Sequence, residues 1–414
     1  MGNVSGFGTG RIGDIIYSIE SRYEKTIAEV LDRDLLQELC TAMQFSSKSL
    51  DDLIANNSPV MRTVKGHVFE TFFDEILREG GYSSEVVGGD TEIDRVVHGK
   101  KLQLKTPTES GTKGNMVQFK THKTHGAKSE MESMDYYSTI DHFADYLVGL
   151  ISYEPLNILI MSPDELPRHK LSERHIQSPF TVDWTKAKGL NAFDRIGVDF
   201  TKIKRFGQDT DDELLPRTAS KIGVDSGVIL RTILSQSNFR IWDMSIRGFI
   251  REQVFKESLN FSGVETTNPM ESGRPRADKA DLAIKVPKGL IMMQMKGVST
   301  NNCNFAISDP EIATETQLTR GRVNDHPTQS RLYLKSDFDT LIIGLDPPIV
   351  EICKEKLTGK RELKWEFYAI PVEELLVHPS MPHRLKSLQK FKYSELQKYL
   401  VDDWKNFARK TRGA

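Results

Sequence analysis

The chain has 414 residues, of which 28% are charged and 38% hydrophobic, and its formal net charge is −2. This is an ordinary globular balance, and the length predicts two or three domains, each able to bury its own core. Three widely spaced cysteines without a Cys-x-x-Cys pair support neither a disulfide framework nor a zinc site. Since no apolar run is long enough for a membrane span and no signal-peptide core is present, we expect a cytoplasmic protein without a membrane partner.

The hydrophobic pattern predicts helices at the start of each half of the chain and strands in between. Residues 14–56 repeat apolar positions with a mostly helical period, and SGVILRTILSQ provides a second helical lead-in. We expect a helical N-terminal segment, a first α/β domain, a connector with the second lead-in, and a second α/β domain with a helical tail, at residues 1–59, 60–195, 196–243 and 244–414.

The first α/β domain contains a polar constellation on a helix and a hairpin. VKGHVFETFFDEIL reads as a helix carrying Gly66 and Glu70, and IDRVVHGKKLQLK reads as a hairpin carrying Asp94, Gln103 and Lys105. Gln103 and Lys105 must share one face of their strand because side chains alternate. Gly66 lies one turn before Glu70, and we expect it to allow a close approach of the helix to the sheet.

The second domain spells the same constellation in the same order, roughly 190 residues later. IRGFIREQVFKESL carries Gly248 and Glu252, and ADLAIKVPKGLIMMQMK carries Asp281, Gln294 and Lys296. Two more matches follow each lysine. FADYLVGL and FDTLIIGL share Phe-x5-Gly-Leu, and ILIMSPDEL and FYAIPVEEL both read as apolar strands followed by a proline turn and an acidic cap. An ordinary solvated strand face explains either copy alone, but it does not explain why all these features recur in one order.

These residue types suit the hydrolysis of a phosphodiester. A hard cation such as Mg²⁺ prefers oxygen ligands, and it can polarise a phosphate and acidify a bound water. The aspartates offer a charged oxygen, the glutamines an amide oxygen, and a lysine beside them can offset charge that develops in the transition state. The constellation therefore predicts a metal-dependent phosphodiesterase site in each half.

The pattern resembles the PD-(D/E)XK nuclease superfamily in a Gln-x-Lys variant, and most of all its type II restriction endonucleases. The resemblance implies a mixed sheet flanked by helices, Mg²⁺, and cleavage of double-stranded DNA to a 5′-phosphate. It matches the aspartates to the family's invariant acid, the lysines to its lysine, and the helix glutamates to a further acid found in many members. The glutamines replace the usual Asp or Glu and remove one negative charge from each site. The resemblance thus implies as metal ligands Glu70, Asp94, Gln103, Glu252, Asp281 and Gln294.

A glutamine-containing site needs a second carboxylate to balance a divalent ion. Glu70 and Glu252 are the candidates, and we expect their carboxylates within roughly 4–7 Å of the aspartates. Glu85 and Glu92 in the first half and Asp278 in the second are competitors, since they are nearer in sequence to the catalytic strand.

Readers of the DNA sequence are expected in the loops after each lysine. Residues 98–128 contain seven lysines and one acid, which is typical of a phosphate-binding patch, although a solvated lysine-rich loop has the same composition. Arginine suits guanine, and asparagine or glutamine suits adenine. The candidate DNA-binding residues are Lys113, Asn115, Gln118, Lys120, His122 and Lys123 in the first half, and Asn301, Asn302, Asn304, Gln317, Arg320, Arg322 and Arg331 in the second.

Two sites in one chain predict how a duplex is cut. Breaking both antiparallel strands requires two sites related by about twofold symmetry, which two tandem restriction-endonuclease-like domains would supply within a monomer, as a single-chain pseudo-dimer. We therefore expect a site-specific restriction endonuclease, with any cognate DNA methyltransferase acting as a separate protein. The alternatives are a nicking or DNA-repair endonuclease with one active half, and a catalytically inactive DNA-binding protein.

Overall fold

The chain forms two compact units in a computed structural model, which describes residues 36–37, 39–41, 43–87, 93–108, 113–121, 137–203, 215–234, 246–287, 289–298, 302–317 and 332–410. Residues 51–241 make up the first unit, and residues 242–414 together with residues 1–50 make up the second. The N-terminal segment expected at residues 1–59 is divided between the units: its described residues up to Leu50 group with the second unit, and those from Asp51 group with the first. The helical pattern predicted before residue 36 lies outside the described residues.

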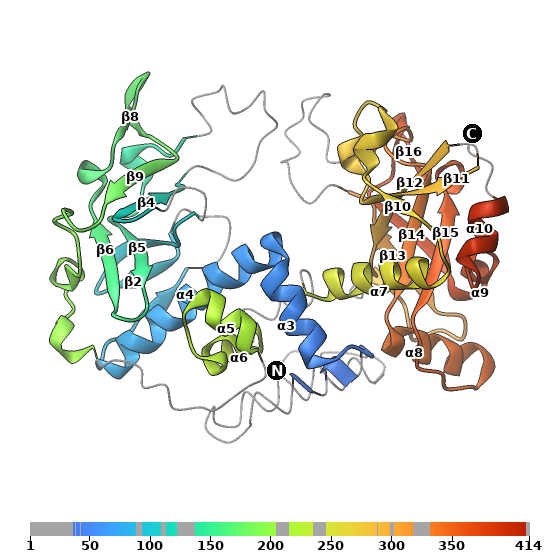
Figure 1. The fold of residues 1–414 in the computed structure, drawn as a ribbon, viewed down its shortest axis with the longest axis horizontal. Coiled ribbons are helices and arrows are strands. Elements are labelled where there is room, and N and C mark those ends of the chain that lie inside the picture. Colours follow the sequence, from blue (N-terminus) through green and yellow to red (C-terminus); the bar gives the residue numbers. More distant parts are fainter. Residues whose placement is uncertain are drawn as a thin grey trace. The chain divides into compact units, whose positions relative to one another are not determined.

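The first unit is built around a five-stranded mixed sheet (Figure 1). Its strands lie in the order β1-β2-β3-β5-β6, and only β3 and β5 run parallel. Two small antiparallel sheets, β4–β9 and β7–β8, accompany it. The elements are α3 (Ser47–Asn56), which contains the residue boundary between the units, α4 (Ser58–Glu79), β1 (Glu85–Val86), β2 (Arg95–Val97), β3 (Lys100–Lys105), β4 (Met116–Phe119), η3 (Ile140–His142), β5 (Tyr146–Ser152), β6 (Asn157–Met161), η4 (Pro163–Glu165), β7 (Arg168–His169), β8 (Ser172–Ile176), β9 (Phe180–Asp183), η5 (Phe193–Ile196), η6 (Phe200–Lys202), α5 (Pro216–Ile222) and α6 (Ser226–Leu234).

The second unit repeats this topology. Its five-stranded sheet has the order β10-β11-β12-β14-β15, and again only the third and fourth strands of the order, β12 and β14, run parallel. The small sheets β13–β18 and β16–β17 correspond to β4–β9 and β7–β8. The elements are α7 (Arg247–Phe261), β10 (Thr266–Thr267), η8 (Pro269–Ser272), η9 (Ala277–Lys279), β11 (Leu282–Val286), β12 (Gly289–Lys296), β13 (Glu311–Glu315), β14 (Thr340–Leu345), α8 (Pro347–Thr358), β15 (Glu366–Pro371), η11 (Val372–Glu374), β16 (Val377–His378), β17 (Met381–Leu385), β18 (Leu388–Lys392), α9 (Tyr393–Leu396), η12 (Gln397–Tyr399) and α10 (Trp404–Lys410).

The expected mixed α/β class is confirmed, because each unit has a mixed five-stranded sheet accompanied by helices. Equal strand order and equal strand direction in both units also agree with the repeat seen in the sequence. The main difference follows the fourth strand. A short turn joins β5 to β6, whereas the twelve-residue helix α8 lies between β14 and β15.

Local sequence explains the helix and the hairpin that carry the first constellation. α4 starts at Asn57, whose side-chain oxygen accepts a hydrogen bond from the N–H of Val60 at 3.3 Å, a typical N-cap. The turn between β2 and β3 consists of His98 and Gly99, with φ of 47° and 74°. Two successive positive φ values characterise a type I′ turn, which matches the twist of a two-residue hairpin. This turn fixes the register in which Arg95 pairs with Leu102.

Apolar side chains cover both faces of the second sheet. On one face, residues of β12 and β14 pack against α7 and α10, with Met293, Ile342 and the fully buried Phe255 at the centre. On the other face, Leu341 and Ile343 belong to the cluster that includes Ile312 of β13. Because strand residues alternate, Gln294 and Lys296 lie on the β13 face, and Met293 and Met295 lie on the α7 face, as the sequence predicted.

The helical pair α5–α6 belongs to the first unit. Arg231 of α6 forms an ion pair with Glu75 of α4, with 2.8 Å between Nε and Oε1. At the start of α5, Thr218 donates its backbone N–H and its hydroxyl to the Asp51 carboxylate, at 2.9 and 2.7 Å. The segment predicted as a lead-in to the second domain is therefore packed onto the helix of the first (Figure 1).

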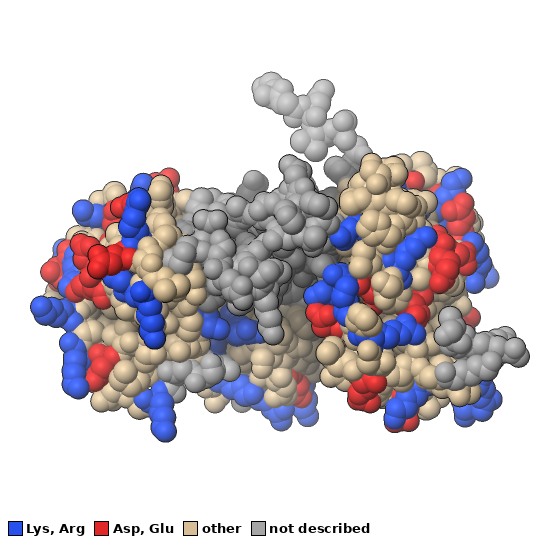
Figure 2. All heavy atoms as spheres, turned by 90° about the horizontal axis from the view of Figure 1, so that it is seen from above, with Lys and Arg blue, Asp and Glu red and all other residues tan. Residues whose placement is uncertain are grey.

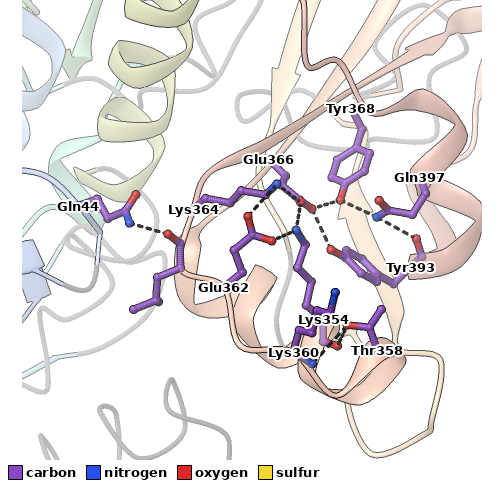
Figure 3. Close-up of polar contacts among 11 residues, drawn as sticks. Gln44, Lys354, Thr358, Lys360, Glu362, Lys364, Glu366, Tyr368, Tyr393 and Gln397 are labelled. Carbon is purple, nitrogen blue, oxygen red and sulfur yellow. Dashed lines mark hydrogen bonds and ion pairs between the residues drawn. The ribbon is translucent and has the colours of Figure 1, made fainter.

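A buried carboxylate ties together the outer elements of the second unit. Glu366, on β15, is 2% exposed and accepts hydrogen bonds from the hydroxyls of Tyr368 and Tyr393, the latter at 2.9 Å (Figure 3). Its other oxygen lies 3.0 Å from Nζ of Lys354 and 3.4 Å from Nζ of Lys364. Buried charges are stable only when paired in this way, so the network fixes α8 and α9 against β15.

None of the helices in the described ranges has both the length and the apolar character needed to cross a membrane.

Candidate active sites

The first constellation converges at the end of β3 that carries Lys105. Asp94 directly precedes β2, and its backbone N–H donates to the carbonyl of Leu102 at 2.8 Å. Its Oδ2 accepts a hydrogen bond from the N–H of Leu104 at 2.7 Å and lies 3.9 Å from Nζ of Lys105. The hairpin thus fixes the aspartate carboxylate beside the lysine ammonium, with both side chains less than a third exposed.

The charge of Glu70 on α4 acts on this aspartate. Burial raises the pKa of Asp94, the charge of Lys105 opposes that effect, and the negative charge of Glu70 adds to it. Burial also acts to raise the pKa of Glu70, but His67, whose Nδ1 lies 3.7 Å from Oε1 of Glu70, and the charge of Arg95 hold that pKa below its usual value. Two carboxylates that repel one another in a partly buried site form an arrangement that a divalent cation would relieve.

The second constellation has the same backbone geometry. The N–H of Asp281 donates to the carbonyl of Met293 at 2.9 Å, and its Oδ2 accepts from the N–H of Met295 at 2.8 Å. In both units, therefore, the aspartate accepts from the residue directly before the lysine. Gln294 adds a hydrogen bond from Nε2 to Oδ2 of Asp281 at 2.5 Å.

The lysine of the second unit lies in a more enclosed environment than Lys105, whereas Asp281 as a whole residue is exposed. Burial of its carboxylate nevertheless raises the pKa of Asp281 to about 6, and the charge of Glu252 contributes to the rise. Burial lowers the pKa of Lys296, against the opposing charges of Asp281 and Glu315. Its ammonium lies 5.3 Å from the ring centre of Tyr333 and donates to the carbonyl of Gln317 at 3.4 Å.

Both helix glutamates have a cationic neighbour. Arg95 contacts Glu70 at 3.3 Å through Nη2, and Lys256 contacts Glu252 at 2.6 Å. Glu70 and Glu252 are 24% and 28% exposed, so neither points fully into solvent. Their charges act on the aspartates, as the candidate role requires, while the expected 4–7 Å separation stays a prediction.

The glutamines provide the clearest sign of a ligand-binding site. Gln103 is 4% exposed and Gln294 is 2% exposed, yet Oε1 of each has no hydrogen-bond partner among the described residues. A buried acceptor left unpaired is costly, and unpaired acceptors at matching positions of two units point to a shared cause. A hard cation would satisfy both oxygens, and in the second site turning the amide over would bring its oxygen toward Asp281.

The donor set fits a hard cation with few protein ligands. Within the described ranges, no group of three or more His, Cys, Asp and Glu side chains is arranged to hold a metal. Each site instead offers two carboxylates and one amide oxygen. Mg²⁺ usually binds through one or two carboxylates and keeps several waters, so this set is compatible with it.

No protein-family model, curated protein or solved structure matches this chain. Its function is therefore inferred from its own residues.

The structure shows a second repeated aspartate, which the sequence analysis did not identify. Asp145, directly before β5, accepts from the N–H of Lys101 at 2.8 Å, and Asp339, directly before β14, accepts from the N–H of Met292 at 2.8 Å. Both carboxylates cap the neighbouring parallel strand, β3 or β12, and so hold the strand that ends in the lysine. The sequence could have indicated this role, because an aspartate stands immediately before the apolar residues of each of these two strands.

The Phe-x5-Gly-Leu pattern falls on the matching strands β5 and β14, but its glycines do not occupy equivalent positions, since Lys105 pairs with Gly149 and Lys296 with Ile343. A Cβ on Gly149 would lie 2.6 Å from the ring of Phe119 in β4, whereas a Cβ on Gly344 would lie 2.4 Å from Cδ of Arg251 in α7. If the two strands are aligned on the capping aspartates Asp145 and Asp339, Gly149 corresponds to Ile343 and not to Gly344. Since consecutive strand residues face opposite sides of a sheet, the two glycines lie on opposite faces of their sheets.

The expected reason for the helix glycines was wrong. A Cβ added to Gly66 or Gly248 would meet no described atom within 4 Å, so neither glycine serves a close approach of helix to sheet.

The candidate DNA readers have mixed surroundings. Lys113, Asn115 and Lys120 are exposed beside or on β4, as are Asn302 and Asn304 before β13. Gln118 and Gln317 are half-buried, and each makes a side-chain hydrogen bond within its own unit, to Thr108 and Glu315. The remaining candidates lie outside the described residues: His122, Lys123, Asn301, Arg320, Arg322 and Arg331. Basic and acidic side chains are interspersed on the face of both units seen in Figure 2.

The competing acids are less well placed than the helix glutamates. Glu85 is exposed on the edge strand β1, and Asp278 pairs with its neighbour Lys279 at 2.6 Å. Neither is among the charges that act most strongly on Asp94 or Asp281. Glu92 lies outside the described residues.

A cavity of about 760 Å³ lies in the first unit, next to the segment that follows Lys105. It lies just beyond the carboxyl ends of β3 and β5, between Thr106, Tyr153 and the helices α4, α5 and α6. Its volume falls in the range of small-molecule pockets, and the carboxyl ends of parallel strands are a common place for them.

Proposed function

We propose that the chain is a Mg²⁺-dependent endonuclease that hydrolyses double-stranded DNA, with one PD-(D/E)XK-like site in each unit. The single observation that carries the proposal is the repeated geometry. In each unit an aspartate, fixed by the N–H of the residue before the lysine, lies next to a buried glutamine whose Oε1 has no described partner.

The residues have distinct tasks in this proposal. Asp94 and Asp281, with the glutamine oxygens and the helix glutamates, would hold Mg²⁺, which polarises the scissile phosphate and lowers the pKa of water. Lys105 lies within 3.9 Å of its aspartate, where its ammonium can orient a water and offset charge that builds on the phosphate. The capping aspartates hold the lysine strands in place and need not touch substrate.

One site in each unit suits double-strand cleavage by one chain, as in a site-specific restriction endonuclease. The exposed polar residues at β4 and before β13 are then candidates for base contacts.

The difference between the two sites favours a second candidate, an endonuclease with one active half that nicks DNA. Lys296 is more enclosed than Lys105, because it contacts Tyr333 and Gln317, and burial lowers its pKa. A lysine engaged in this way has less freedom to act on a phosphate.

Cleavage of supercoiled plasmid with Mg²⁺ tests these alternatives. Linear product at the first detectable time supports two working sites, and accumulation of nicked circle supports one. Duplex binding without any cleavage would leave a DNA-binding protein. Sequencing the ends of digested phage DNA would then show whether one site is recognised, and a product without 5′-phosphates would contradict the assigned chemistry.

A further inference from the structure

The helix glycines Gly66 and Gly248 have no structural explanation among the described residues. Glycine is a poor helix former, so its presence inside a helix usually has a cause in the backbone or in packing. Neither residue has a positive φ, in contrast to Gly99 and Gly223.

Packing does not explain them either. Gly149, Gly297 and Gly344 have neighbours that a Cβ would overlap at 2.1–2.6 Å, whereas a Cβ on Gly66 or Gly248 would meet no described atom within 4 Å. Both residues are only partly buried. An alanine would fit each position, and it would favour the helix.

The placement of the two glycines indicates what they are for. Each lies one turn before the helix glutamate, so Gly66 and Glu70 share a face of α4, as Gly248 and Glu252 share a face of α7. Arg95, which directly follows Asp94, contacts Glu70 at 3.3 Å, and Arg251, the neighbour of Glu252 on α7, lies against Gly297, which directly follows Lys296. Both helices therefore approach the strand ends that carry the candidate sites. The unpartnered Oε1 atoms of the nearby buried glutamines also indicate that these sites take a ligand.

We propose that the bare helix surface at Gly66 and Gly248 receives the sugar–phosphate backbone of the strand that is cut in that unit. The inference rests on the proposed nuclease function and deepens it. A side chain at either position would hold the backbone away from the aspartate and the lysine, while the helix itself would gain stability. Glycine is the residue that permits the closest approach of a ligand to a backbone.

Substitution by alanine and by glutamine tests the proposal, since both are good helix formers and neither changes the charge. We expect Gly66→Ala and Gly248→Ala to raise the midpoint of thermal unfolding by about 2–4 °C, because alanine favours the helix. Gly66→Gln should slow cleavage of one strand at least tenfold, and Gly248→Gln should slow cleavage of the other, with no fall in the midpoint. Asn260→Gln, at an exposed position of α7, is the matched control and should change neither property.

The outcomes separate this inference from the proposed function. If both glutamine variants cleave both strands at wild-type rates, the inference is overturned and the proposed function is not affected. A fall in the unfolding midpoint of both alanine variants would also overturn the inference, because it would show that the glycines have a packing role. If the wild type cleaves no DNA, the nuclease proposal fails, and duplex affinity measured with Ca²⁺ decides the inference. The inference is then supported if Gly66→Gln and Gly248→Gln bind the duplex more weakly than Asn260→Gln does. It is overturned if all three variants bind equally or if none of the proteins binds.

Discussion

Replacing Asp346 by asparagine should strongly destabilise the second unit. Asp346 is the N-cap residue of α8 and is fully buried, and Arg247 and Arg251 of α7 both bind its carboxylate. Burial alone would raise the pKa of Asp346, but the charges and hydrogen bonds of the two arginines hold it below the usual value. Asp346→Asn keeps the shape and leaves two buried guanidinium groups facing a neutral amide.

The size of the expected destabilisation follows from the burial of Asp346 and its two arginines. Arg247 is 9% exposed and Arg251 is 7% exposed, so neither can recover hydration when its partner loses its charge. Breaking a buried ion pair in this way costs about 3–5 kcal/mol. For a domain of this size that corresponds to a fall in the unfolding midpoint of roughly 6–20 °C. Glu265→Gln removes an exposed partner of Lys285 and should leave the unfolding midpoint nearly unchanged.

Hydrogen exchange read by mass spectrometry can assign the loss to one unit. Peptides from α7 and α8 should lose protection in Asp346→Asn, whereas peptides from α4 should not. The depressed pKa also fixes the sign of the pH dependence. The carboxylate of Asp346 contributes fully to the free energy of unfolding above the ordinary aspartate pKa of about 3.9. This contribution disappears as the pH falls through the lower pKa that Asp346 has in the folded state. An unchanged midpoint at neutral pH would refute this account of the cluster.

Three further predictions concern the candidate sites. Lys105→Ala and Lys296→Ala should each abolish cleavage of one strand and leave the other, so that plasmid is nicked; linear product at the wild-type rate from either variant would contradict two working sites. Asp94→Asn and Asp281→Asn should lose cleavage at millimolar Mg²⁺ far more than duplex affinity measured by fluorescence anisotropy, because a neutral amide holds a hard cation poorly. Because burial raises the pKa of Asp281 to about 6, protonation should compete with cation binding below that pH, so the Mg²⁺ concentration that gives half-maximal cleavage by the second site should rise as the pH falls; no such rise, followed on end-labelled DNA, would contradict a ligand role for this carboxylate.

The local geometry around each candidate site could be predicted from the sequence, while the roles of its residues stay predictions. An aspartate before a short strand and Gln-x-Lys at the end of the next strand are linked by one hairpin, so alternation alone decides which side chains share a face. Asp94, Gln103 and Lys105 were found in this way, and their counterparts followed from the repeat.

The sequence was less informative where the outcome depends on strands far apart in the chain. The parallel pairing of β12 with β14 sets which residue faces α7, and a shift of one residue put Gly344 against Arg251. The same limitation hid the capping role of Asp339, whose partner Met292 is 47 residues away. Long-range register is fixed by packing, which a single sequence does not display.

The discontinuous second unit has a consequence for how the chain matures during synthesis. The side chain of Gln44 donates to the carbonyl of Leu363 at 2.7 Å, and the indole of Trp365 donates to the carbonyl of Met43 at 3.0 Å (Figure 3 shows Gln44). These partners are more than 300 residues apart, and the whole first unit is translated between them. Since chains emerge from the N-terminus at about 5–20 residues per second, the segment around Gln44 must wait roughly 15–65 seconds for its binding surface. The intervening 190 residues can fold as an uninterrupted stretch in that time, whereas the other unit is completed only when its last strands have left the ribosome.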